Sequence, residues 1–514
     1  MNSRPPLSTA AIFGLLLAAY LTLGALYAVY TPLWQIPDEP AHFNYVKHLA
    51  EQRRLPVLQQ GDYPAAYLEE IKAHKFPPDM SVDPIRYEFY QPPLYYGLAA
   101  TIYVATASWP LSSQVVALRL LSVLLGTGVL WLAYRIVCEI FLSARPDRFS
   151  ETCQVSASML ALGTAAFAAA VPMHIAMTAA VNNDALAELI LAGILYLGVR
   201  ITQREASDRE WVGLGALVGL GLLTKGTTYI AIPLVLAILY IGLRRSEMRG
   251  ALAVRRSAKA FLLVFGSALI LSGGWFLRNG LVYGLDDPLA WKRHTQVVAG
   301  QLTTAEYLAR HGWRGWVGDF LATTFRSFWG QFGWMGVPMD RRVYLFLGLL
   351  SGLVALGLVL LVIRQWRDGE RRGFSPGQLW ALALAALSLL LTVAQYLWLN
   401  RQFVQFQGRY LFSSIIPLGL AFALGLAEIL RRGYETWVGA LLGGGALIAA
   451  LKGLQTGGPD KWLIALLAAG AAGFLVKRTL PARFAGLFVA LVYIALLALS
   501  AASPFLFIVP YLHW

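Results

Sequence analysis

The sequence is dominated by apolar stretches long enough to cross a lipid bilayer. A transmembrane helix needs about 20 consecutive, mostly apolar residues, and such stretches recur along the 514-residue chain. Only 14% of the residues are charged, whereas a soluble domain carries about 25%. The sequence therefore predicts a polytopic membrane protein.

We expect an all-α fold with about thirteen spanning helices. The predicted spans are 8–30, 115–137, 156–177, 185–200, 211–224, 227–243, 260–282, 343–363, 378–398, 410–429, 436–451, 461–477 and 484–509. The stretch 92–110 is apolar but short and interrupted, so we predict an interfacial or re-entrant helix there. The first apolar segment is too long for a signal-peptide core, and we expect no cleavable signal.

Arginine and lysine predict the orientation of these spans. With the N-terminus inside, the basic loops 244–259, 364–373, 431–435 and 477–483 all lie on the inner side, as the positive-inside rule requires. The long segments 31–114 and 283–342 then lie outside. We therefore expect a multi-pass protein of the plasma membrane with its polar site on the extracytoplasmic face.

Several function classes are disfavoured by what the sequence lacks. Two cysteines are too few for a disulfide framework or a Cys-rich metal site. There is no phosphate-loop motif, no Rossmann glycine fingerprint and no D-x-D triplet. The net charge of +14 lies largely in the inner loops, which favours contact with anionic membrane lipids over nucleic acid.

An acidic pair, Asp38 and Glu39, directly follows the first predicted span. Pro37 and Pro40 flank it and favour a turn that opens a short helix, so Asp38 is expected near the N-cap. A structural cap explains Asp38 about as well as a functional carboxylate does. His42 lies one helical turn further on, and Asp38, His42 and Asp184 are the candidates for a divalent metal site, which stays open.

Other polar residues are expected at the same outer level of the membrane. Each has a structural alternative as a helix cap or boundary residue, but together they suit transfer chemistry on a lipid phosphate. A carboxylate can act as general base, and cations can stabilise a departing phosphate. The residues are Tyr90, Gln91, Asn183, Asp184, Lys225, Arg278 and Arg409.

Six motifs point to a known family. They are "PDEPAHFNYVKHLAEQRRLPV", "YQPPLYYGLAA", "RLLSVLLGTGVLWLAYRI", "NNDALA", "LLTKGT" and "QGRYLF". In these motifs the chain resembles the C-type (GT-C) membrane glycosyltransferases, above all bacterial family 39 and the lipid A aminoarabinose-transferase-like enzymes, which are kin to protein O-mannosyltransferases. The resemblance covers about residues 8–430, and we therefore assign 1–430 to a catalytic transmembrane module. The helices in 431–514 carry no recognised motif.

The resemblance implies an inverting transfer of a sugar from a polyprenyl-phosphate donor to an acceptor at the outer face. It implies that Asp38 is the catalytic base, with Glu39 beside it and Asp184 as a second acidic residue. Lys225, Arg278 and Arg409 are its candidates for the carrier phosphate, and no cofactor is required. The sequence departs from the family at Tyr90 and Gln91, where relatives often have His-Lys or His-Gln before the two prolines.

Two other function classes stay open at this point. A transporter or flippase for a lipid-linked sugar would share the helices and the cationic groups without needing a base, although the paired broken segments typical of transporters are not evident. A membrane scaffold would leave the charged residues at the outer face without a role. The sugar and the acceptor, whether glycan, lipid or protein, are not indicated by the sequence.

Overall fold

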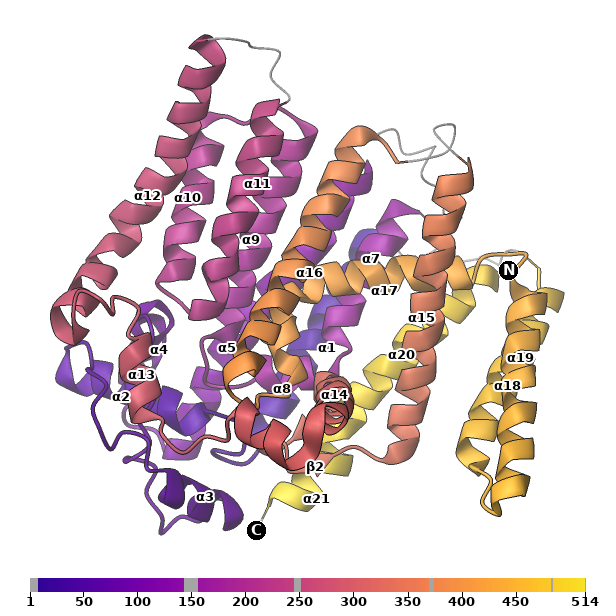
Figure 1. The fold of residues 1–514 in the computed structure, drawn as a ribbon, viewed down its shortest axis with the longest axis horizontal. Coiled ribbons are helices and arrows are strands. Elements are labelled where there is room, and N and C mark those ends of the chain that lie inside the picture. Colours follow the sequence, from indigo (N-terminus) through magenta and orange to yellow (C-terminus); the bar gives the residue numbers. More distant parts are fainter. Residues whose placement is uncertain (1–7, 143–155, 245–250, 369–373, 482–483, 514) are drawn as a thin grey trace.

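The computed structural model describes residues 8–142, 156–244, 251–368, 374–481 and 484–513. The chain forms a bundle of long helices with groups of shorter helices at one end (Figure 1). Within the described residues, eleven helices are long and apolar enough to cross a membrane, or twelve if one bent pair is counted as a span. The predicted all-α, polytopic class is confirmed.

Eight of these spans are single helices and three are composite. The single helices are α1 (Thr9–Tyr30), α5 (Leu111–Leu142), α9 (Asp184–Gln203), α12 (Ala251–Tyr283), α15 (Arg341–Asp368), α16 (Pro376–Gln402), α18 (Glu435–Thr456) and α19 (Lys461–Thr479). In the composite spans, α11 (Ala231–Arg244) continues η1 (Gly226–Ile230), and α17 (Ile415–Ile429) continues η3 (Gly408–Ser414). The third joins α20 (Ala485–Ser503), η5 (Pro504–Ile508) and α21 (Val509–Leu512).

The prediction of thirteen spans was too high, because two of the predicted spans are short or broken helices. The predicted span 211–224 is α10 (Asp208–Leu222), a helix of 15 residues. At 1.5 Å per residue it extends about 22 Å, less than the roughly 30 Å of a hydrocarbon core. The predicted span 156–177 is divided into α7 (Ala157–Ala169) and α8 (Pro172–Thr178), which are bent by 68°. Pro172 has no backbone N–H to continue the first helix.

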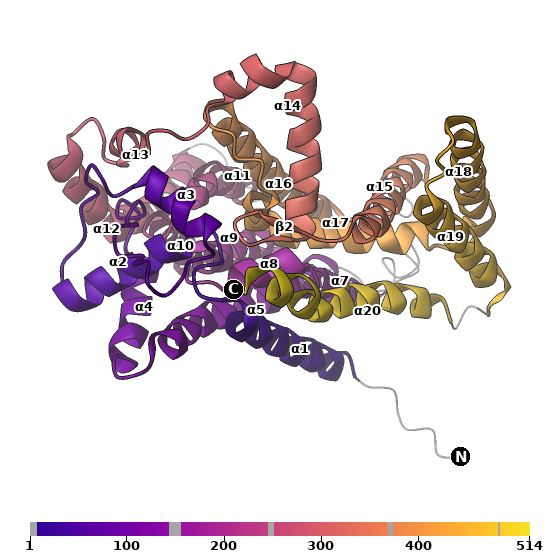
Figure 2. The same cartoon turned by 90° about the horizontal axis from the view of Figure 1, so that it is seen from below.

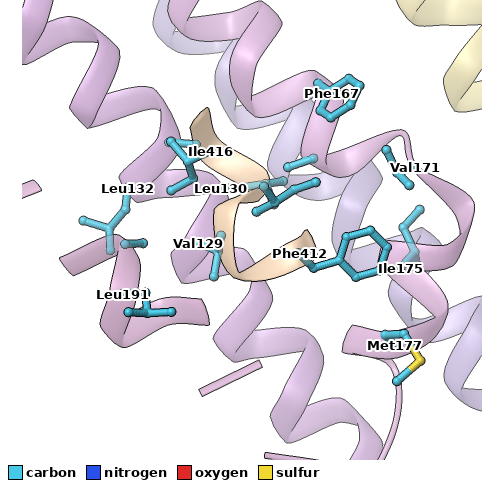
Figure 3. Packing of buried hydrophobic residues seen from close by; sticks show 14 of the residues in the cluster. Val129, Leu130, Leu132, Phe167, Val171, Ile175, Met177, Leu191, Phe412 and Ile416 are labelled. Carbon is cyan, nitrogen blue, oxygen red and sulfur yellow. The ribbon is translucent and has the colours of Figure 1, made fainter. Parts of the chain in front are cut away.

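The core lies between α5, α7, α8, α9, η3 and α17. In α9 and in the composite span of η3 and α17, 72% of the apolar window is buried inside the protein, against 11% in α19. Figure 3 shows the centre of this core, where Val129 of α5, Ile175 of α8 and Phe412 of η3 belong to one cluster. The most buried helices therefore hold the bundle together, whereas most of the apolar window of α19 lies at the protein surface.

Both long segments that were expected outside the membrane gather at one end of the bundle (lower end in Figure 1). The first contains α2 (Glu39–Gln52), α3 (Ala65–Ala73) and α4 (Leu94–Ala105). The second contains α13 (Trp291–Val297), α14 (Thr304–Trp329) and a short antiparallel pair, β1 (Gln331–Phe332) and β2 (Val337–Pro338). With 12 residues, α4 is too short to span, in agreement with its expected interfacial or re-entrant character.

The helix ends that flank the basic segments lie at the opposite end of the bundle. The C-terminal end of α11 and the N-terminal end of α12 are at the top of Figure 1, and so are the ends of α15 and α16 that flank 369–373. Parts of the basic loops lie outside the described residues. The end that carries α2, α3, α13 and α14 is therefore the end away from the arginine-rich connections.

The C-terminal helices differ in how they meet the bundle. The hydroxyl of Tyr27 in α1 donates to the Ser500 carbonyl of α20 at 3.0 Å, and Ser500 Oγ donates to the Ala170 carbonyl at 2.9 Å. In contrast, α18 and α19 form a pair at the periphery (Figure 2). Within that pair Lys477 Nζ and Glu435 Oε1 lie 2.6 Å apart. The last span thus packs on the first, across the whole sequence.

The crossing of α15 and α17 depends on glycine and yields a test of the packing. A Cβ at Gly357 would lie 2.0 Å from the Gly425 carbonyl oxygen, whereas one at Gly352 on the same helix meets nothing within 4 Å. Because such overpacking costs roughly 1–3 kcal/mol, Gly357→Ala should lower the thermal unfolding temperature of the detergent-solubilised protein. Gly352→Ala is the matched control and should unfold like the wild type. Equal unfolding temperatures for both variants would contradict the close crossing.

Candidate active site

A cavity of about 500 Å³ opens where the two outer segments meet the ends of several helices. Its wall combines residues before and after α2, the ends of α9 and α16, the segment from α10 to η1, α13 and η3. Seven of the predicted site residues line it. They are Asp38, His42, Tyr90, Gln91, Asp184, Lys225 and Arg409.

Asp38 occupies the N-cap position of α2 but does not cap it. Its backbone is left-handed, with φ 68° and ψ −7°, and its side chain makes no capping hydrogen bond. For a residue with a Cβ this conformation costs free energy and is often found at functional sites. The carboxylate instead accepts the Tyr87 hydroxyl on Oδ1 at 2.8 Å and Arg409 Nη2 on Oδ2 at 2.6 Å. The capping explanation of this residue is therefore wrong.

The charges around Asp38 keep it ionised. Burial is the largest single influence and would raise the pKa of Asp38, but the guanidinium of Arg409 and its neighbours together lower that pKa to about 2. His42 and the hydrogen bond from Tyr87 act in the same direction. Asp38 is thus a carboxylate throughout the physiological pH range, with both oxygens in contact with donors.

The neighbouring carboxylate, Glu39, points away from the cavity into the bundle. It is fully buried and forms a two-pronged ion pair with Arg119 of α5, with Nε to Oε1 at 2.8 Å and Nη2 to Oε2 at 2.6 Å. The backbone N–H groups of Trp34 and Val181 also donate to it. Both oxygens of Glu39 are therefore occupied by structural partners. Its position inside the bundle does not favour the catalytic role that the sequence predicted for it.

Arg119 had no role in the sequence-based site. It also donates to the carbonyl oxygens of Ala28, Thr31 and Pro32 at the end of α1. A buried arginine inside an apolar stretch is costly unless it is paired. The position of Arg119 within such a stretch was therefore a sequence signal that could have marked it as a structurally important residue. The partner could not be identified in the same way, because Glu39 lies 80 residues away in the sequence.

A second ion pair faces the cavity between α9 and η1. Lys225 Nζ and Asp184 Oδ1 lie 2.6 Å apart, with exposed side-chain fractions of 15% and 27%. Burial would lower the pKa of Lys225, but the carboxylate of Asp184 raises it overall. Asn183 lies behind this pair, where its amide donates to the Thr224 carbonyl at 3.0 Å and to Gln91 Oε1 at 3.5 Å. Asn183 therefore holds the cavity residues in place without being among those that line the cavity.

The turn at 87–91 brings three further side chains to the cavity. Gln91 Nε2 donates to the Tyr90 hydroxyl at 3.1 Å, and the Tyr90 ring packs on His294 of α13 with centroids 4.3 Å apart. Glu88, which was not among the predicted site residues, also lines the cavity and is 9% exposed. Burial, reinforced by the negative charge of Asp38, raises the pKa of Glu88 to about 7.

His42 was one of the three predicted candidates for a metal ligand. His42 Nδ1 lies 2.7 Å from the Tyr96 hydroxyl, and burial lowers the pKa of His42 to about 3, assisted by the nearby charge of Lys225. Among the described residues, no group of three or more His, Cys, Asp or Glu side chains is arranged to hold a metal ion. Asp38 and Asp184 already have cationic partners in the chain, so a metal site there stays a prediction.

The structure does not bring Arg278 into the cavity. Its guanidinium donates to the Pro56 carbonyl and to Asn279 Oδ1, and it packs over the rings of Trp275 and Tyr283. Trp275 lines the cavity, but Arg278 is not among the lining residues. Of the three predicted phosphate-binding cations, Lys225 and Arg409 therefore share one site and Arg278 does not.

The arrangement can bind an anion and accept a proton in the same place. The cations Lys225 and Arg409 share a largely desolvated cavity with the carboxyl groups of Asp38, Glu88 and Asp184, and electrostatic interactions are stronger there than in water. Aromatic rings from distant segments complete the wall, including the pair Tyr229 and Trp291 with centroids 6.1 Å apart. Apolar walls with a few convergent polar groups are typical of small-molecule sites. The contributions of His294, Trp291 and Trp334 from the second outer segment carried no signal in the sequence.

Comparisons with known proteins show which family the chain matches and which solved structures have a similar fold. A family model described as predicted membrane protein (DUF2142) matches residues 21–419. No curated protein sequence matches the chain.

Three solved structures show a weak likeness in fold. The first is ArnT from Cupriavidus metallidurans bound to undecaprenyl phosphate, at 16% identity and a TM-score of 0.48, over 96% of this chain and 74% of that one. The second is the Archaeoglobus fulgidus oligosaccharyltransferase in the apo form, at 13% identity and a TM-score of 0.42, over 94% of this chain and 56% of that one. The third is the S. cerevisiae protein O-mannosyltransferase Pmt1–Pmt2 complex bound to the sugar donor. It has 14% identity and a TM-score of 0.36, and the match covers 52% of this chain and 34% of that one. Since all three scores are below 0.5, the GT-C type stays a prediction.

The buried pair of Glu39 and Arg119 predicts a strong asymmetry between single and double substitution. Arg119→Met leaves a buried carboxylate without its partner and should cost about 3–5 kcal/mol of stability, whereas replacing both residues by Met should recover much of it. The free energies are compared by denaturant unfolding in mixed micelles. The exposed pair of Lys259 and Asp208, each 60% exposed, is the control, and Lys259→Met there should change little. Similar losses at both pairs would contradict a structural role for Arg119.

Proposed function

The chain belongs to the DUF2142 family of predicted membrane proteins, and we propose that it is an inverting glycosyltransferase. The donor is a sugar linked to polyprenyl phosphate, and the acceptor is a hydroxyl or amine that arrives at the outer face of the plasma membrane. The sequence resemblance to the GT-C enzymes supports the reaction class. The observation that carries the proposal is the Asp38 carboxylate, which is held at the cavity wall between Arg409 and Tyr87.

The roles of the residues follow from their charges. The oxygen or nitrogen of the acceptor attacks the anomeric carbon of the sugar from the face opposite to the phosphate, and its proton passes to Asp38. The bond between the anomeric carbon and the phosphate oxygen breaks, and its electron pair stays on the departing phosphate. Lys225 and Arg409 stabilise the negative charge that develops there. Asp184 keeps the Lys225 ammonium in place through the 2.6 Å ion pair.

The position of the cavity in the bundle supports the outer face as the place of reaction. The cavity lies at the end that carries both long segments, away from the helix ends that flank the arginine-rich connections. By the positive-inside rule those connections are cytoplasmic. A lipid-linked donor would enter from the bilayer, with its prenyl chain among apolar helices and its phosphate at the level of Arg409. No cofactor is needed for this reaction, since a base and two cations supply its chemistry.

The first prediction from this proposal concerns Asp38. Asp38→Asn removes the proton acceptor but keeps the shape of the side chain, so we expect at least a 100-fold loss of transfer. The measurement is transfer of radiolabelled sugar from polyprenyl-phosphate donors to native membrane extract. Asp79→Asn, an exposed residue of the same outer segment, should retain full activity. If wild type and Asp38→Asn transfer equally, Asp38 is not the base. If neither transfers although both bind donor, a flippase becomes the better proposal.

The second prediction concerns pH. Only the ionised form of Asp38 accepts a proton, and Arg409 holds the pKa of Asp38 low, so kcat of the wild type should stay constant as the pH falls through the mildly acidic range. Arg409→Met removes the cation while the burial remains, which raises the pKa of Asp38 and moves the acidic loss of kcat to higher pH. The measurement is kcat at saturating donor against pH. Arg409→Lys keeps the positive charge and should resemble the wild type more closely. A wild-type profile that falls as early as that of Arg409→Met would contradict the role of this ion pair.

A further inference from the structure

Glu88 differs from the other acidic side chains of the cavity because it has no cationic partner. Glu88 lines the cavity and is 9% exposed, and its buried Oε2 atom makes no hydrogen bond. The other acidic residues of the wall, within the described part of the chain, are paired. These pairs are Asp38 with Arg409, Asp184 with Lys225, and Glu188 with His174.

A buried acid without a cation tends to hold a proton, because desolvation disfavours its charged form. The ionisable groups near Glu88 come from several elements and partly oppose each other. The carboxylates of Asp38 and Asp184 disfavour its ionisation, whereas the ammonium of Lys225 and the amide of Gln91 favour it. The phenols of Tyr87, Tyr90 and Tyr96 also lie within electrostatic reach. Burial is the largest of these influences and raises the pKa of Glu88 to about 7.

We propose that Glu88, in its protonated form, binds the phosphate of the lipid-linked donor by donating its O–H to a phosphate oxygen. This inference rests on the proposed function, because it assumes that an anionic phosphate occupies the cavity. It assigns to Glu88 a part in donor binding and in the pH dependence of that binding, and none in the transfer of the acceptor proton.

The charge balance of the cavity favours this role. Two of the charged residues that line the cavity have partners outside this group, because Glu188 pairs with His174 and Lys72 pairs with Glu69. The remaining cluster consists of Asp38, Glu88, Asp184, Lys225 and Arg409. With Glu88 ionised, this cluster is net negative before any anion enters. With Glu88 protonated the cluster is neutral, and an incoming phosphate meets a hydrogen-bond donor where it would otherwise meet a like charge. An O–H donor to an anionic oxygen forms one of the stronger hydrogen bonds. The bound anion in turn stabilises the protonated form, so donor binding takes up a proton when Glu88 is ionised in the free protein.

If Glu88 were the general base and not a donor-binding group, the experiments would give different results. If Glu88 accepted the proton of the acceptor, its ionised form would be required and the rate would increase with pH. The amide of a Glu88→Gln variant would then abolish turnover. In our proposal the amide replaces the protonated carboxyl, because it is neutral at every pH and also carries hydrogen-bond donors.

The test measures binding without turnover. The probe is farnesyl methyl phosphate, a phosphodiester that keeps one negative charge across the pH range and so adds no titration of its own. Isothermal titration calorimetry of the full chain in lipid nanodiscs gives Kd from acidic to alkaline pH. Repeating each titration in two buffers of different ionisation enthalpy counts the protons taken up on binding.

For the wild type we expect a constant Kd at acidic pH and a Kd that rises by up to about tenfold per pH unit above neutrality. Proton uptake should approach one per probe at alkaline pH. Glu88→Gln should bind at all pH values with a nearly constant Kd and without proton uptake. Glu88→Ala should bind more weakly throughout. The matched control Glu70→Gln, at an exposed position of α3, should behave like the wild type.

The failures of the two proposals can be told apart. If the wild type does not bind the probe at any pH, the donor class of the proposed function is wrong. If it binds with a Kd that does not depend on pH and without proton uptake, only the role of Glu88 is wrong. Proton uptake that persists in Glu88→Gln, or a Glu88→Gln protein that is folded but no longer binds, also overturns that role. Should Glu88→Gln fail to fold, the proton count of the wild type still decides.

Discussion

The ion pair between Asp38 and Arg409 joins two parts of the chain that are 371 residues apart and fixes the geometry on which the candidate site depends. On one side of the pair is the left-handed turn before α2, and on the other is the irregular segment η3 that leads into α17. Both charges are largely withdrawn from water, so each would be costly without the other. The turn, the start of α2 and the entry of η3 therefore form one electrostatic unit.

Asp38 and Glu39 show how adjacent, chemically similar residues acquire different tasks. The left-handed backbone at Asp38 directs its carboxylate to the cavity, whereas Glu39 begins the helix and meets Arg119 inside the bundle. Arg119 in turn binds three carbonyl groups at the end of α1. Glu39 thus ties the start of α2 to α1 and α5, and this anchoring can support the strained conformation of its neighbour.

Hydropathy and charge predicted the membrane class, most spans and the short character of α4, because these properties depend on local composition. They overestimated the number of spans, since the length of α10 and the bend between α7 and α8 are set by packing and by Pro172. Local motifs also identified Asp38, Asp184, Lys225 and Arg409, which share one cavity. They could not separate Arg278 from this group, because only tertiary structure decides whether an arginine meets a carbonyl or a cavity. The same limit applies to Arg119, to Glu88 and to the aromatic wall from α13.

The pairing of every strong cation in the cavity with a carboxylate has a consequence for the proposed reaction. The donor is a phosphodiester with one negative charge, and the departing polyprenyl phosphate carries a second one. As the acceptor proton reaches Asp38, the negative partner of Arg409 is neutralised, and the guanidinium becomes available to the phosphate at the moment when the phosphate charge increases. Charge thus moves from carboxylate to phosphate beside a cation that remains in place, so little reorganisation of the surroundings is required. A site with unpaired cations would bind the anionic donor and product more tightly but would lack this compensation, because equal stabilisation of ground state and transition state does not accelerate the reaction.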